Sequence, residues 1–172
     1  MNLKEAVTGK EIPEKIQKSL TLVTVPYFSF DKESREGQLV VHTELVEDVE
    51  EIFHTLYKTQ FPIAQMVPIA AYGWDDDASM RANNSSAFNY RLIFGTERLS
   101  NHSFGRAIDI NPMQNPYRQR NGILVPPGAQ YDLTQEGTIT KEIADIFISY
   151  GWEWGGNWEE QKDWQHFQKT LE

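Results

Sequence analysis

Hydrophobic and polar residues alternate along two early segments and then follow a helical period. Residues 21–30 and 38–46 are rich in β-branched and aromatic residues, which predicts two strands. The polar, glycine-containing stretch 31–37 between them predicts a hairpin connection. From 46 to 58 the apolar residues recur at helical spacing and acidic residues crowd the first turns, as the helix dipole favours. The sequence thus begins with a hairpin and a helix, and Pro62 closes that helix.

The next part of the chain predicts short extended pieces separated by a polar connection. Residues 61–72 have the composition of a strand with a proline-marked irregularity, and 73–86 form a long polar connection in which Asp77 is the expected helix cap. Residues 88–94 and 106–111 are expected to be short extended pieces. Together they bracket a loop that is rich in polar residues.

The last third predicts a long loop, a helix and an aromatic tail. Proline, glycine, asparagine and glutamine dominate 112–138, which predicts loop structure. Helical spacing returns over 140–150, with Thr140 as a cap and Gly151 as a stop. This order of strands and helices predicts an α+β fold, a small antiparallel sheet with flanking helices.

The length of 172 residues fits one compact domain. Residues 1–20 mix charges with few apolar anchors, so we expect an N-terminal arm, with residues 21–172 as the single domain. The absence of cysteine excludes disulfide frameworks, thiolate zinc fingers and iron–sulfur clusters. Any metal must therefore be bound by histidine, aspartate or glutamate, and the chain has only four histidines.

The net charge of −9 argues against nucleic acid and anionic membranes as partners. No stretch approaches the ~20 apolar residues that cross a bilayer, so we expect no membrane span. We expect a monomer. The location stays open: the cell envelope or the exterior if a leader has been removed, or the cytoplasm before release.

The first candidate site is the segment 100–109. His102 lies in a loop, and Asp109 follows seven residues later on the strand entered after Gly105, so one imidazole nitrogen and one carboxylate oxygen can reach the same ion. Ala107 lies on the same strand face as Asp109 and leaves space above it. The same spacing also fits a histidine bonded to a turn and an aspartate that caps a strand.

The second candidate site lies near the end of the chain. His166 has an apolar, strand-forming neighbourhood, and Asp163 can reach round from the bend where that strand begins, which would place a metal ligand beside a base. A surface aspartate and a core histidine among tryptophans would give the same pattern. These two segments hold two of the four histidines, each next to a carboxylate.

Together these segments resemble the zinc enzymes of peptidase family M15, the D-Ala-D-Ala carboxypeptidases and L-alanyl-D-glutamate peptidases, which act on bacterial cell-wall stem peptides. The resemblance covers roughly residues 60–170. It implies a fold like that of the D,D-peptidases and Hedgehog proteins. The blocks that carry it are FNYR (88–91), SNHSFGRAIDINP (100–112), NPY (115–117), GWEWGGNW (151–158) and DWQHF (163–167).

Carried over position by position, the resemblance makes His102, Asp109 and His166 the ligands of one Zn²⁺ per chain. Asp163 takes the place of the catalytic carboxylate, where many relatives have the longer glutamate. Arg91 corresponds to the arginine that holds the polarised carbonyl oxygen. Two other arginines compete for that role: Arg98 stands close before the motif, and Arg106 should face away from the metal.

Two imidazoles and one carboxylate leave an open position on zinc, as in hydrolytic sites. With this open position, the resemblance implies a zinc peptidase that hydrolyses peptidoglycan stem peptides, either as a D,D-carboxypeptidase that releases D-Ala or as an L-Ala-D-Glu endopeptidase. Ser85 and Ser86 are candidates for binding a substrate carboxylate, and Trp154 for a substrate wall. The alternative is a non-catalytic wall-binding module with a structural metal.

Overall fold

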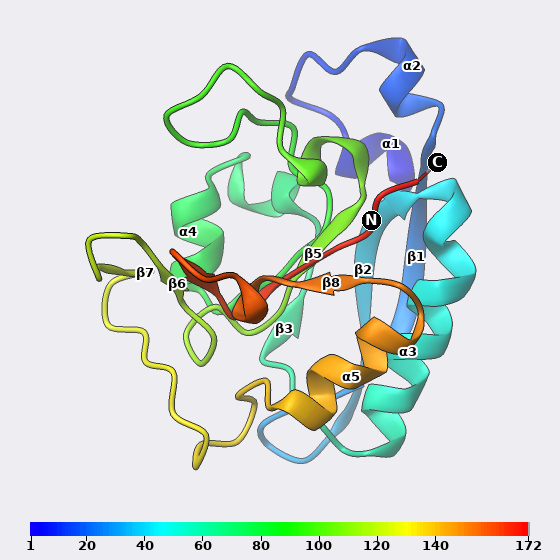
Figure 1. Cartoon of the computed structure of the whole chain (residues 1–172). Helices are drawn as coiled ribbons and strands as arrows, with labels where there is room; N and C mark the ends of the chain where they lie inside the picture. The colour runs from blue at the N-terminus through cyan, green and yellow to red at the C-terminus, as the bar shows by residue number, and fades with distance from the viewer. Residues whose placement is uncertain (172) are drawn as a thin grey trace.

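The computed structural model describes residues 1–171 and has an α+β architecture (Figure 1). Strands β1 (Leu20–Phe28) and β2 (Ser34–His42) form a long antiparallel hairpin. Helix α3 (Val46–Lys58) lies along β1, and α5 (Lys141–Ser149) contacts α3. The predicted hairpin and both longer helices are confirmed. β2 starts four residues before its predicted beginning at 38, because Ser34–Gly37 continue the pairing with β1.

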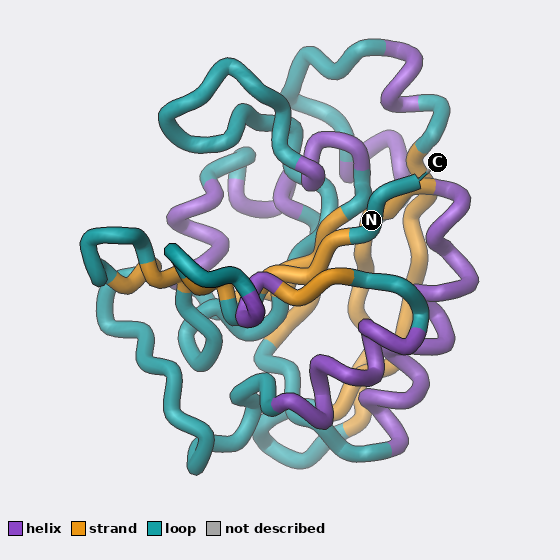
Figure 2. The backbone as a smooth tube through the Cα atoms, viewed as in Figure 1, coloured by secondary structure: helices purple, strands orange, loops and turns teal. Residues whose placement is uncertain are grey.

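The remaining strands are only two or three residues long and form three small sheets (Figure 2). Two of these sheets are antiparallel and have three strands each, and the third is a parallel pair. In sheet order they are β5 (Ala107–Asp109), β10 (His166–Gln168) and β8 (Glu153–Trp154); β7 (Leu124–Val125), β6 (Tyr117–Arg118) and β9 (Lys162–Asp163); and β3 (Gln65–Met66) with β4 (Asn84–Ser85).

Short helical turns fill much of the rest, and none of the helices within residues 1–171 is long and apolar enough to cross a membrane. The α-helical turns are α1 (Leu3–Ala6), α2 (Glu14–Gln17) and α4 (Asp76–Arg81). The 3₁₀ turns are η1 (Thr43–Leu45), η2 (Ile69–Tyr72), η3 (Asn101–Phe104) and η4 (Gly155–Asn157).

Three expectations from the sequence were wrong in this region. The strand expected over 61–72 is the two-residue β3 followed by the 3₁₀ turn η2, since the proline at 68 cannot donate to a ladder and begins a turn instead. The polar connection 73–86 contains α4, whose cap is Asp75 rather than Asp77 because the Asp75 side chain accepts the Ala78 amide. The loop 112–138 contains the β6–β7 pair.

The β1–β2 hairpin is covered on both faces. Its inner face packs against α3 and α5 in the main core, with Val25 and Val41 almost fully buried. Val40 precedes Val41 on β2 and points to the opposite face, where it packs in a second cluster with Ile12 and Ile16 of the N-terminal arm. The arm thus covers the outer face of the hairpin.

A close backbone contact fixes the segment before β5 against the end of β2. The Gly105 carbonyl accepts a hydrogen bond from the His42 amide at 2.8 Å. Gly105 has a φ of +65°, and a Cβ at this position would lie 2.6 Å from the His42 nitrogen. Only glycine fits both the backbone conformation and the space.

We therefore expect Gly105→Ala to lower the free energy of unfolding by about 2–4 kcal/mol, because left-handed strain adds to a steric clash. Gly95→Ala is the matched control, since Gly95 has a φ of +74° and no atom within 4 Å of its added Cβ. The control should lose only about 1–2 kcal/mol. Urea denaturation measures both values, and equal losses would contradict the close contact at Gly105.

Candidate metal centre

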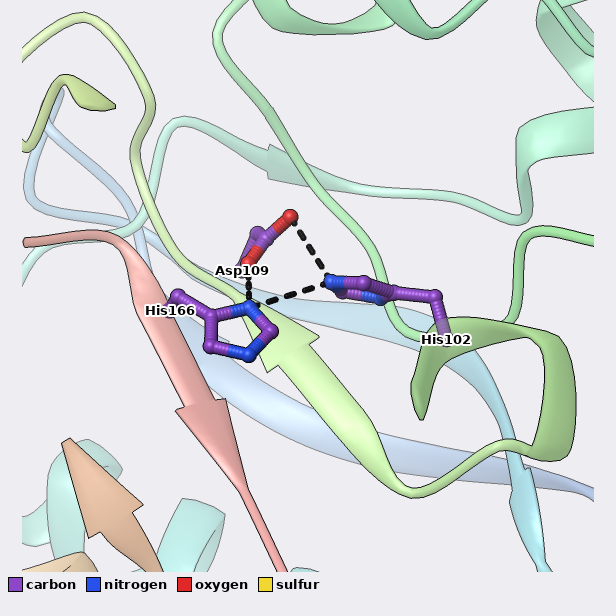
Figure 3. A group of neighbouring side chains, drawn as sticks. All are labelled: His102, Asp109 and His166. Atoms are coloured by element: carbon purple, nitrogen blue, oxygen red, sulfur yellow. Dashed lines mark hydrogen bonds and ion pairs between the residues drawn. The ribbon is translucent and has the colours of Figure 1, made fainter. Parts of the chain in front are cut away.

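Three side chains from two distant parts of the chain point toward one another (Figure 3). His102 lies on η3, Asp109 ends β5 and His166 begins β10. Asp109 and His166 are direct partners in the antiparallel β5–β10 pair. The sheet register therefore brings together the two segments that the sequence analysis singled out.

The three side chains offer their ligand atoms to one common point. His102 Nε2 lies 3.1 Å from Asp109 Oδ2 and 3.2 Å from His166 Nδ1. His166 Nδ1 lies 2.9 Å from Asp109 Oδ1. One ligand atom from each residue lies within 4.8 Å of the others. Two imidazole nitrogens and one carboxylate oxygen at this spacing fit a divalent ion such as Zn²⁺, with a fourth position left for water or substrate.

Backbone and side-chain contacts determine which nitrogen of each histidine faces the centre. His102 Nδ1 bonds to the Ala87 carbonyl, which can only accept, so this nitrogen carries the hydrogen and Nε2 keeps a lone pair. His166 is oriented the other way round. Its Nε2 donates to Gln168 Oε1 at 3.1 Å, which leaves Nδ1 for the metal.

Gln168 is itself held by two further side chains. Its Oε1 also accepts a hydrogen bond from Asn101 Nδ2 at 2.7 Å, and its Nε2 donates to Glu153 Oε2 at 3.0 Å. The Glu153 carboxylate can only accept a hydrogen bond, so the amide nitrogen of Gln168 must face it. The amide oxygen of Gln168 therefore faces His166. The sequence analysis did not identify Gln168, which lies on β10 and whose orientation depends on side chains of η3 and β8.

Charges and hydrogen bonds within the centre shift the pKa values of Asp109 and His166. Burial alone would raise the pKa of Asp109, but the charges and hydrogen bonds of His102 and His166 hold it well below its usual range. Burial alone would lower the pKa of His166, but the hydrogen bond and charge of Asp109 outweigh it and raise this pKa to about 9. Without a metal, His166 is therefore protonated at neutral pH and donates from both nitrogens.

Asp163 lies on β9 beside this centre. Its Oδ1 is buried and has no hydrogen-bond partner among the described residues. Burial raises the pKa of Asp163 to about 7, while the positive charges of His166 and Arg91 act in the opposite direction. A Cβ at Gly155 would lie 2.9 Å from the Asp163 Cβ, so the glycine allows η4 to pack against this aspartate. An unpartnered carboxylate of this kind can accept a proton.

Arg91 is held on the same side as Asp163 by a residue that the sequence analysis did not identify. Arg91 Nε forms an ion pair with Asp76 Oδ2 at 3.1 Å, although the geometry is not that of an aligned hydrogen bond. Asn89 Nδ2 donates to the other oxygen of Asp76 at 3.0 Å. The acidic run at 75–77 was visible in the sequence, but nothing there showed which of its members meets Arg91.

The structure also shows the surroundings of the three residues predicted to bind substrate, Ser85, Ser86 and Trp154. The Ser85 hydroxyl is fully buried and accepts the Asn111 amide. Ser86 is 7% exposed, and its backbone pairs with Asp109. Trp154 donates to the Trp164 carbonyl and lines a cavity of about 360 Å³. These substrate-binding roles stay predictions.

The two competing arginines also have defined places. Arg98 is exposed, and its backbone carbonyl accepts the Ile93 amide in the turn of 92–99. Arg106 lines a cavity with residues of the N-terminal arm. Of these three arginines, Arg91 is the one whose charge acts on the pKa of Asp163, which favours it over both competitors.

The raised pKa of His166 predicts that metal binding releases a proton. A protonated imidazole cannot be a ligand, so Zn²⁺ binding at pH 7 should release about one proton per site. Since this pKa is about 9, the apparent affinity should rise with pH between about 6.5 and 8, by up to tenfold per unit. Titration calorimetry in buffers of different ionisation enthalpy measures the proton count. No dependence on the buffer would contradict a protonated His166.

The hydrogen bonds of Gln168 predict an effect on metal affinity. Gln168→Ala removes the acceptor that orients His166, so the affinity for Zn²⁺ should fall by about 10–100-fold. Competition with a chromophoric chelator measures it. Gln130→Ala is a suitable control because Gln130 is exposed. Equal affinity in the Gln168 variant and the parent would show that His166 needs no such support.

The comparisons with known proteins agree with this geometry. The model of a family described as D-alanyl-D-alanine carboxypeptidase, within the M15 peptidases, matches residues 94–169. Neither the curated proteins nor the solved structures gave a match. The matched segment contains His102, Asp109, Asp163 and His166. The family resemblance found in the sequence is thereby confirmed over residues 94–169: the segment that carries the candidate metal centre is similar to the M15 peptidases.

Proposed function

We propose that this protein is a zinc-dependent peptidase that hydrolyses amide bonds in peptidoglycan stem peptides. It would act either as a D,D-carboxypeptidase that releases D-Ala or as an L-Ala-D-Glu endopeptidase, and thus in the cell envelope. The family match supports peptidase activity. The observation that carries the proposal is the buried group of His102, Asp109 and His166 with the unpartnered oxygen of Asp163 nearby.

The chain's own residues fit the steps of amide hydrolysis. His102 Nε2, Asp109 and His166 Nδ1 would hold the Zn²⁺. The bound ion would polarise the amide carbonyl and lower the pKa of water. Asp163 Oδ1 accepts a proton from the attacking water and passes it to the departing amine. Its burial suits this exchange, because it raises the pKa of Asp163 to about 7. At neutral pH the carboxyl group can therefore both accept a proton and give it up.

Arg91 would stabilise the negative charge that develops on the carbonyl oxygen. Asp76 pairs with its Nε, so the two terminal nitrogens are free to turn toward the substrate. Asp76 is in turn fixed by Asn89. A pre-oriented donor of this kind costs little reorganisation when the charge forms. A metal with a purely structural role would need neither this arginine nor a buried base.

An aromatic cavity shares one residue, Trp158, with the surroundings of His166, and is our candidate for the place where substrate binds. Trp154 and Trp158 are among its lining residues, and the cavity has a volume of about 360 Å³. The Trp158 ring centroid is 5.5 Å from that of the ligand His166. We propose Trp154 as part of the substrate wall, with Ser86 as the more accessible of the two serine candidates.

Digestion of purified muropeptides tests the proposal and separates its two forms. The zinc-loaded protein should release free D-Ala if it is a carboxypeptidase, or create a new D-Glu amino terminus if it is the endopeptidase. Mass spectrometry of the products distinguishes them. Asp163→Asn should lower kcat by about 10²–10⁴-fold, because the amide cannot accept the proton, while Zn²⁺ stays bound.

His102→Ala is the companion variant, since it should lose both the metal and the activity. Metal analysis of all three proteins by mass spectrometry makes the comparison complete. Rates in Asp163→Asn equal to those of the parent would show that another group is the base. Zinc binding without cleavage of any muropeptide would favour the wall-binding alternative.

A further inference from the structure

A second cavity is lined in part by Phe104 of η3, the 3₁₀ turn that also carries His102. Its volume is about 440 Å³, and its walls come from the N-terminal arm, the end of β2 and the start of β5. The lining residues are Pro13, Lys15, Ile16, Ser19, His42, Phe104 and Arg106. Five of these seven lie outside the residues 94–169 that match the peptidase family. The cavity is therefore a feature of this chain that the metal centre does not require.

The charges that line this cavity are all of one sign. Lys15 and Arg106 are cationic, no carboxylate lines the wall, and neither cation forms an ion pair among residues 1–171. The Arg106 guanidinium lies 5.6 Å from the centroid of the Phe104 ring, and its buried Nε has no hydrogen-bond partner. Buried donors of this kind normally have an acceptor.

His42 supplies a third donor to the same space. Its side chain is 8% exposed, and its Nδ1 accepts the backbone amide of Glu44. Burial lowers the pKa of His42 and the charge of Arg106 lowers it further, and together they outweigh the opposing charge of the nearby Glu44 carboxylate. The imidazole is therefore neutral at pH 7 with its hydrogen on Nε2, which makes this nitrogen a donor.

We propose that this cavity is a binding site for a small organic oxyanion, with a phosphate or carboxylate head held by Lys15, Arg106 and His42. Pro13, Ile16 and Phe104 provide apolar surface for the organic part. A cavity of this volume lies within the range of small-molecule sites and exceeds what a free inorganic anion fills. The site is separate from the peptidase chemistry and does not depend on it.

Titration with phenyl phosphate, benzoate and inorganic phosphate, followed by amide shifts in ¹⁵N-labelled full-length protein, tests this proposal. Saturable shifts confined to residues 13–19, 42–44 and 104–106, with a Kd of about 1 mM or below, are expected for at least one aromatic anion. Tighter binding of phenyl phosphate or of benzoate identifies the head group. Inorganic phosphate should bind more weakly than phenyl phosphate, because it leaves the apolar wall uncovered.

Two variants and one control locate the binding. Arg106→Gln and Lys15→Gln should each weaken binding by about 10-fold or more, since each removes a charged donor. Lys15 is exposed, so its variant keeps the fold even if the Arg106 variant does not. Lys10→Gln removes the same charge from an exposed position of the same arm and should change nothing.

The metal centre must be separated from the cavity, because anions also bind zinc. His102→Ala should bind the aromatic anion as the parent does, with or without added Zn²⁺. Binding seen only with Zn²⁺, or lost in His102→Ala, would overturn the proposal. So would equal affinities in Arg106→Gln, Lys15→Gln and Lys10→Gln, or the absence of saturation with every anion. None of these outcomes depends on whether the protein cleaves muropeptides.

Discussion

The candidate metal centre depends on one strand pairing, that of β5 with β10. In this register Asp109 stands directly opposite His166. Side chains alternate between the faces of a strand, so a shift of one residue would turn one of these ligands to the opposite face. Neither strand is longer than three residues, so the pairing cannot be stabilised by its own length. It is held by its surroundings, since Ile108 and Phe167, which form the neighbouring pair of this ladder, are fully buried.

The same pairing places opposite charges in a buried position. The carboxylate of Asp109 lies between two imidazoles, and each imidazole has its outer nitrogen engaged by an acceptor. A buried carboxylate is costly unless it is paired, and here the pairing atoms are the atoms that would bind the metal. The negative charge of Asp109 can therefore be balanced either by a proton on His166 or by a divalent cation.

Sequence reasoning succeeded where the pattern was long or where the chemistry was local. The β1–β2 hairpin and α3 could be predicted because nine to thirteen consecutive residues follow one period. The three residues of the candidate metal centre could be singled out because each lies in a short motif that resembles a known family, and the structure brings them together. The two-residue strands could not, since two residues have no period. Asp76 and Gln168 were missed for a related reason: their importance comes from tertiary contacts with Arg91 and His166.

The segment that matches the peptidase family cannot form this centre alone. His102 Nδ1 needs the carbonyl of Ala87, and the strand that carries Asp109 needs the backbone of Ser86. Arg91 and its partner Asp76 also precede residue 94, where the match begins. The matched segment contains the candidate ligands and the proposed base, whereas the preceding residues contact them and include Arg91, the proposed source of positive charge. The centre is thus a product of the packing between the two halves, with Gly105 against His42 as one of the contacts that hold them together.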